Sequence, residues 1–173
     1  MKKLLFACVA VVAALSLCGC KSSTAVVADD YRYELENVKG SSTAGYVTVK
    51  VWSYGRRERL TKRKCMANAV HGILFKGLDA DETGTLGRIA PMVPGGYASN
   101  SAYFDNFFKE AYMQYVQESS KGSMAAGDII KMSKSKEVKM GMVVKINMNS
   151  LRSRLENDGI LTGVRGLFSN PNN

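Results

Sequence analysis

The sequence predicts an α+β fold: a small antiparallel sheet with two main helices packed on one face and a short C-terminal helix. Residues 46–54 and 138–148 alternate apolar and polar side chains, which is the period of a strand with one buried face. Residues 56–76 and 101–118 repeat their apolar side chains every three or four positions, as a helix with one buried stripe does. The predicted order of strand, helix, helix, strand, strand, helix favours helices grouped on one side of the sheet.

The first predicted strand places three valines on one face and is broken by Gly55. The helix that follows concentrates its apolar stripe in its second half, at Met66, Val70 and Ile73. These two elements would open the folded domain.

A long loop is predicted over residues 78–100, because glycine and proline at this density are incompatible with a regular element. Ser101 can cap the second helix, which we expect to extend to residue 118. Its aromatic side chains would form one broad face that fills the core: Phe104, Phe107, Phe108, Tyr112 and Tyr115.

The clearest strand covers residues 138–148, with one fully apolar face and one largely polar face. A shorter strand over residues 129–132 can pair with it through a tight connection. The last helix begins near Ser150 and ends at Gly159, and Ile160 suits the apolar contact that accompanies a glycine cap.

The N-terminus has the pattern of a bacterial lipoprotein signal. Two lysines precede an apolar run over residues 4–17, which is too short to span a bilayer, and small residues lead to Cys20. We expect cleavage before Cys20 and acylation of its thiol with fatty acids such as palmitate. The alternative is an ordinary secretory signal with a chance cysteine.

The chain is therefore divided into a signal peptide (1–19), a lipidated tether (20–42), one α+β domain (43–168) and a disordered tail (169–173). The tether is predicted because its residues include few large apolar side chains and several that favour solvent. About 150 residues after cleavage are enough for one hydrophobic core.

The formal net charge is +9, and removal of Lys2 and Lys3 with the signal leaves 22 basic against 15 acidic residues. Residues 56–64 hold six cations among nine positions. Anionic headgroups, lipopolysaccharide phosphates and acidic proteins are available ligands in the envelope, whereas nucleic acid is not expected there. A solvated helix face without a ligand is the other interpretation. The predicted partner-binding residues are Arg56, Arg57, Arg59, Lys62 and Arg63.

No catalytic residue, metal site or cofactor is predicted. His71 is the single histidine, and six residues of helix place it on a different face from Cys65. Nearby cations favour a thiolate at Cys65, but a free cysteine in a helical pattern is more often a small buried apolar residue. The acidic residues at 79–82 lack the alternating ligands and distal glutamate of a calcium loop.

Residues 47–55, followed by Ala67-Asn68-Ala69-Val70, resemble the strand–helix opening of small envelope lipoproteins related to the N-terminal domain of the flagellar T-ring protein. The closing Val-x-Ile-x-Met strand is similar in kind. The resemblance implies a structural and assembly unit rather than an enzyme. It covers about a quarter of the mature chain, and the basic helix start and the aromatic helix depart from the pattern.

The leading functional hypothesis is a non-enzymatic envelope lipoprotein that acts as a protein-binding or assembly module. We expect it to be membrane-anchored, in the outer membrane facing the periplasm, with an envelope protein or a second copy as partner. The alternative is a small-molecule or lipid ligand held between the aromatic helix and the Gly/Pro-rich loop by Tyr97, Tyr103 and Tyr112. A hydrolytic enzyme is a third, less favoured possibility.

Overall fold

The computed structural model describes residues 31–38, 43–80, 87–119, 128–132 and 136–162. Five antiparallel strands form one sheet: β1 (Tyr33–Asn37), β2 (Tyr46–Arg56), β3 (Val116–Glu118), β4 (Ile129–Lys131) and β5 (Glu137–Asn147). Three α-helices accompany it: α1 (Lys62–Phe75), α2 (Ser101–Phe107) and α3 (Met148–Asn157). Two short 3-10 helices cover Ala98–Asn100 and Ala111–Gln114.

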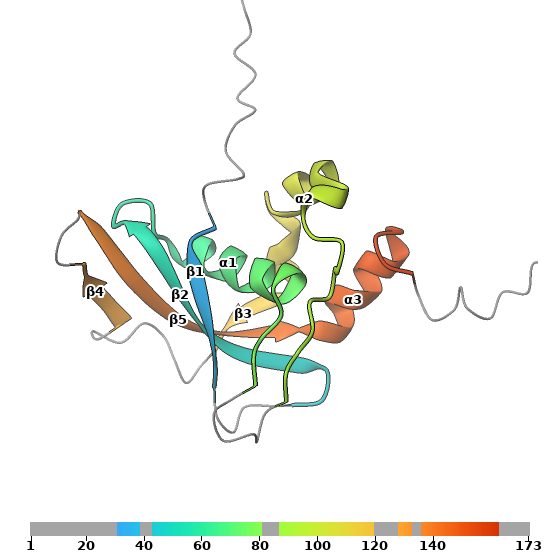
Figure 1. Ribbon diagram of the computed structural model, residues 1–173, viewed down its shortest axis with the longest axis horizontal. Coiled ribbons are helices and arrows are strands. Elements are labelled where there is room, and N and C mark those ends of the chain that lie inside the picture. Colours follow the sequence, from blue (N-terminus) through green and yellow to red (C-terminus); the bar gives the residue numbers. More distant parts are fainter. Residues whose placement is uncertain (1–30, 39–42, 81–86, 120–127, 133–135, 163–173) are drawn as a thin grey trace, which may run out of the picture. The chain divides into compact units, whose positions relative to one another are not determined.

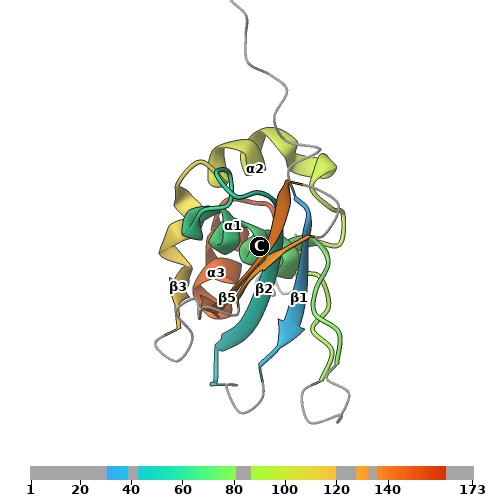
Figure 2. The same cartoon turned by 90° about the vertical axis from the view of Figure 1, so that its left-hand side faces the viewer.

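The centre of the sheet is the long β2–β5 pair, in which Tyr46 lies opposite Asn147 and Arg56 lies opposite Glu137. β1 pairs with the outer edge of β2, and β3 and β4 pair with different parts of β5. Figure 2 shows α1, α2 and α3 on the same side of the sheet. The predicted fold class is therefore confirmed.

The core lies between α1 and the alternating apolar residues of β2 and β5. These strand residues face one side together because directly paired residues share a face: Val49, Val51, Met142, Val144 and Ile146. All five are fully buried, as are Val70 and Ile73 of α1. Each buried side chain of this size contributes about 1.5–3 kcal/mol relative to an exposed one.

Helix α1 begins at Lys62, and the prediction of helix from residue 56 is wrong at its start. The β2–β5 ladder continues to Arg56, and residues 57–59 form a turn closed by a backbone bond from Arg59 to Arg56. The helix then starts behind Thr61, whose side chain accepts a hydrogen bond from the Lys64 N–H. Half of the six cations, Arg56, Arg57 and Arg59, therefore precede the helix, and the other three lie in its first turn.

The prediction of one helix over residues 101–118 is also wrong. α2 ends at Phe107, Ala111–Gln114 form a separate 3-10 turn, and Val116–Glu118 form strand β3. The edge of β5 explains the change, because Val116 pairs there with Ile146 and the backbone of Asn147 donates to that of Tyr115. Tertiary pairing thus overrides the helical spacing of the aromatic residues.

The end of α3 matches its prediction in detail. Gly159 has a φ of 72°, a conformation that glycine adopts without a side-chain clash. Its N–H donates to Glu156, and the N–H of Ile160 donates to Leu155. This is a Schellman motif, and Ile160 packs against the core as expected.

The predicted tether over residues 20–42 is wrong at Tyr33–Asn37, which form strand β1. Tyr33 pairs with Ser53 and Asn37 with Val49, and the compact unit begins at Tyr31. The predicted signal, Cys20 and the tail lie outside the described residues. Within the described part of the chain, no helix is long and apolar enough to cross a bilayer.

Candidate functional site

The structure separates the five predicted partner-binding cations into two groups. Lys62 forms an ion pair with Glu118 at 2.8 Å, and Arg56 lies opposite Glu137 at the end of β2. A hydrogen bond from Arg32 and, to a smaller degree, the charge of Arg56 lower the pKa of the Glu137 carboxyl. The other three, Arg57, Arg59 and Arg63, are exposed, and none forms an ion pair with a residue that the structure describes. We call these three residues the arginine surface.

The arginine surface adjoins a helix start that is electrostatically unfavourable. The first turn of α1 holds Lys62, Arg63 and Lys64 and no acidic residue. Each cation near a helix N-terminus opposes the helix dipole, at a cost of about 0.3–1 kcal/mol. Lys64 is partly compensated, since its Nζ lies 4.7 Å from the ring centroid of Tyr31. Lys62 is compensated by its ion pair with Glu118, whereas Arg63 forms no ion pair with a described residue.

The three tyrosines predicted to line a pocket have their hydroxyls engaged in local hydrogen bonds. Tyr112 is buried and donates to the backbone oxygen of Arg63 at 3.0 Å. Tyr97 donates to Asp105 at 2.6 Å, and Tyr103 donates to Asp158 at the same distance. Burial, followed by the bond to Asp158, raises the pKa of Tyr103 to about 12.

Two of these tyrosines, Tyr97 and Tyr103, also pack against neighbouring aromatic rings. Tyr97 stacks on His71 with centroids 5.9 Å apart and on Phe108 at 6.3 Å. Tyr103 contacts Phe104 edge to face at 5.1 Å. The aromatic residues therefore fill the core on this side, as the sequence predicted for the aromatic face.

His71 is a neutral interior side chain. It is 9% exposed, and burial, followed by the charges of Lys76 and Lys64, lowers its pKa to about 4. Its Nδ1 lies 2.7 Å from the hydroxyl of Tyr33, and the two groups form a buried hydrogen bond. The ring also stacks on Tyr31 with centroids 3.8 Å apart.

Cys65 is fully buried in α1, which confirms the interpretation as a small apolar core residue. Burial raises the pKa of its thiol, although a hydrogen bond with Ser53 and the charge of Lys64 act in the opposite direction. Among the described residues, no group of three or more His, Cys, Asp or Glu side chains is placed to hold a metal ion.

The opposite face of the sheet carries lysines over aromatic rings. The Nζ atoms of Lys50 and Lys139 lie 4.2 and 4.7 Å from the ring centroid of Trp52. Each lysine is also paired: Lys50 with Asp128 at 2.8 Å, and Lys139 with Glu34 at 3.0 Å. Both lysines over Trp52 are thus paired with carboxylates, which favours a structural role for them.

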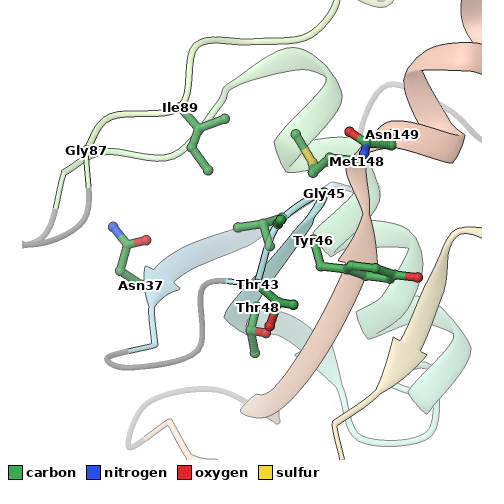
Figure 3. A pocket seen from close by; sticks show the side chains of 11 residues that line it. Asn37, Thr43, Gly45, Tyr46, Thr48, Gly87, Ile89, Met148 and Asn149 are labelled. Atoms are coloured by element: carbon green, nitrogen blue, oxygen red, sulfur yellow. The ribbon is translucent and has the colours of Figure 1, made fainter.

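A cavity of about 390 Å³ lies at the far end of the β1–β2 pair (Figure 3). It is bounded by the end of β1, the turn into β2, the loop at residues 87–89 and the start of α3. The described residues that line it include no charged side chain and none of the three predicted tyrosines: Asn37, Thr43, Ala44, Gly45, Tyr46, Val47, Thr48, Gly87, Ile89, Met148 and Asn149.

Several hydrogen bonds fix the walls of this cavity. The side-chain amide of Asn37 donates to the backbone oxygen of Asp79. The oxygen of Gly45 accepts from the N–H groups of Met148 and Asn149, at 2.9 and 3.4 Å. Gly45 has a φ of 78°, and a Cβ there would lie 2.5 Å from Nδ2 of Asn149. Glycine is therefore required where the turn meets α3.

Sequence reasoning did not find this cavity. Its amides, Asn37 and Asn149, come from segments more than a hundred residues apart, and asparagine is common in turns for backbone reasons alone. The signal that was present is Gly45, a glycine directly before a strongly alternating strand.

Comparison with protein-family models, curated proteins and solved structures gave no significant match to this chain. The resemblance to the T-ring group stays a prediction.

Proposed function

We propose that this chain is a non-enzymatic lipoprotein of the bacterial cell envelope that binds an acidic partner protein through the arginine surface. In this proposal the acylated Cys20 supplies attachment, and the α+β body supplies recognition. The observation that carries the binding role is the exposure of Arg57, Arg59 and Arg63 without an ion pair to any described residue.

Guanidinium groups suit such a role because each presents a planar fork of donors to a carboxylate. Arginine is also enriched among residues that dominate binding energy at protein interfaces. Attachment to the membrane does not need these charges, since buried acyl chains contribute about 0.8 kcal/mol for each methylene. A protein partner with clustered carboxylates therefore fits the arginine surface.

The interior side chains support a binding role over a catalytic one. Of the residues that frequently act as bases or nucleophiles, His71 and Cys65 are both buried. Burial lowers the pKa of His71 and raises the pKa of Cys65, so each is held in its neutral form. Both contribute instead to packing and to hydrogen bonds within the core.

The test is a charge reversal, Arg57→Glu with Arg59→Glu and Arg63→Glu, in the full-length chain expressed in its own bacterium. Proteins cross-linked to the wild-type chain would be recovered from detergent-solubilised membranes and identified by mass spectrometry. The identified partner would then be purified and its binding to both chains measured. We expect the reversal to weaken binding at least tenfold, and we expect added salt to weaken wild-type binding.

A matched control carries the same change in net charge at exposed cations elsewhere: Lys109→Glu, Lys131→Glu and Arg152→Glu. It should keep the partner. Equal loss in both variants, or recovery of the wild-type chain only as a free monomer, would contradict the proposal. Recovery of a second copy as the main product would replace the acidic partner by self-association.

The anchor is tested separately by the mass of the mature chain. Cleavage before Cys20 with a diacylglyceryl group on its thiol is expected, and Cys20→Ser should abolish both. A mature chain without fatty acid would refute the lipoprotein assignment and leave the arginine test unaffected.

A further inference from the structure

We propose that the cavity between the β1–β2 turn and the start of α3 binds a neutral N-acetylated sugar. The proposal concerns a site separate from the arginine surface and does not depend on it. The volume of about 390 Å³ falls in the range of small-ligand sites.

The uncharged lining indicates that the ligand is neutral. None of the described residues that line the cavity is acidic or basic. The cavity lies at the N-terminus of α3, a position that would ordinarily favour an anion. Here the N–H groups of Met148 and Asn149 already donate to Gly45, and the N–H of Ser150 donates to the side chain of Asn147. These N–H groups at the helix start are therefore not available to an anion, and a neutral ligand is favoured.

The polar side chains indicate that the ligand carries several hydrogen-bonding groups. Figure 3 shows Asn37 and Asn149 on opposite sides of the cavity, with the ring of Tyr46 pointing away from Asn37. The bond from Asn37 to Asp79 uses its N–H, so its carbonyl oxygen is the group that can accept from a ligand. Asn149 can both donate and accept, and threonine hydroxyls line the same cavity. Such a set matches a ligand with several hydroxyl or amide groups.

The apolar part of the lining indicates that the ligand also carries a small apolar group. Val47, Ile89 and Met148 supply aliphatic surface beside the amides. An acetamido group matches this mixture, because its N–H can donate to Asn37 while its methyl group packs on Ile89 or Met148. A plain hexose would leave this apolar surface without a partner, and a charged amino sugar would lose hydration without gaining an opposite charge.

The experiment is an NMR titration of the full, processed chain with N-acetylglucosamine, following the methionine methyl signals. The chain should be held in phospholipid bicelles, since a sugar-headed detergent would compete for the cavity. We expect a saturating shift of the Met148 methyl and none at Met113, which is exposed and does not line the cavity. Glucose and glucosamine should bind at least tenfold more weakly.

Two variants locate the binding. Asn149→Ala removes an amide from an exposed position, and Gly87→Leu adds a side chain where nothing lies within 4 Å of the new Cβ. Each should weaken binding about tenfold while leaving the melting temperature unchanged. Ala98→Leu, at an exposed position that does not line the cavity, is the control and should bind as the wild type does.

No shift of Met148 by N-acetylglucosamine, or a shift that neither variant weakens, would overturn the proposal. Equal binding of glucose would overturn the role assigned to the acetamido group. The arginine-reversed chain should bind the sugar normally, so failure of the proposed partner and failure of the cavity site give different results.

Discussion

Gly141 is a position at which the packing of the sheet leaves no room for a side chain. It lies opposite Trp52 in the β2–β5 pair, and the indole ring covers it. A Cβ at Gly141 would lie 2.6 Å from Cζ3 of that ring. The indole is only 9% exposed and lies against the Nζ atoms of Lys50 and Lys139, so a shift of the ring would disturb these contacts.

We therefore predict that Gly141→Ala lowers the free energy of unfolding by about 1–3 kcal/mol, the usual cost of overpacking. Urea denaturation followed by fluorescence measures this, since Trp52 is the single tryptophan. Gly87→Ala is the matched control and should change stability by less than about 0.5 kcal/mol. An unchanged Gly141→Ala variant would show that the ring does not cover this strand as described.

His71 predicts a pH dependence of stability. Its folded pKa of about 4 lies below its ordinary value of 6.5. Above pH 6.5 both the folded and unfolded chains hold a neutral imidazole. Between pH 6.5 and 4 the unfolded chain binds a proton that the folded chain does not, so stability falls as the pH falls. The loss from this group is complete near pH 4 and amounts to about 3 kcal/mol at most.

The measurement is the NMR titration of the single histidine together with denaturation at pH 7 and pH 5. Tyr33→Phe with His71→Phe replaces the buried hydrogen-bonded pair by apolar rings and should flatten the dependence in this range. Tyr33→Phe alone is the control and should keep it. Titration of His71 near 6.5 would contradict its burial.

At the scale of elements, the start of α1 depends on Thr61. Its hydroxyl is the cap for the Lys64 N–H, at 3.2 Å, ahead of a first turn that is entirely basic. We expect Thr61→Ala to cost about 1 kcal/mol. Thr61→Asp should be at least as stable as the wild type, because it keeps an acceptor and adds an anion where the helix dipole favours one.

Thermal unfolding of the two Thr61 variants in low and high salt distinguishes these effects. The advantage of aspartate over alanine should shrink in high salt, since the dipole and charge contributions are screened. A Thr61→Asp variant less stable than Thr61→Ala would refute the cap.

The sequence was sufficient to predict the elements whose pattern agrees with their packing. β2 and β5 alternate cleanly because one face meets α1 and the other meets polar partners, and the Schellman end of α3 depends on local residues only. β1 was missed although Tyr33 and Leu35 alternate with Glu34 and Glu36. The two glutamates suggested a solvated segment, whereas an edge strand exposes one side.

The predictions that failed concern elements decided by distant residues. The helical spacing of Phe104, Phe107 and Phe108 continues to Tyr112 and Tyr115, but the edge of β5 draws residues 116–118 into the sheet. The exposure of the arginines could be anticipated from their charge. Which of them would be left unpaired could not, because Glu118 lies 56 residues from Lys62.

At the scale of the whole molecule, the corrected domain boundary predicts which fragment folds. A chain beginning at Tyr31 keeps β1, and its melting temperature should match that of the longer chain. A chain beginning at Thr43, the start predicted from the sequence, loses Tyr33, which is 7% exposed, and Leu35, which packs against Gly72. It also leaves His71 without the Tyr33 hydroxyl.

Circular dichroism and thermal melting of the two fragments test the boundary. The shorter fragment should melt at least 10 °C lower or fail to fold, because it loses the buried side chain of Tyr33 and the partly buried side chain of Leu35 and exposes the edge of β2. Equal melting of both fragments would restore the original boundary.

The direction of β1 has a spatial consequence for the two proposals. Arg32, at the start of β1, pairs with Glu137 at one end of the sheet, whereas Asn37, where β1 finishes, lines the cavity at the other. Five strand residues separate these ends by about 17 Å. The strand thus holds its two ends at a fixed separation, so a small ligand in the cavity would not reach the Arg32–Glu137 pair.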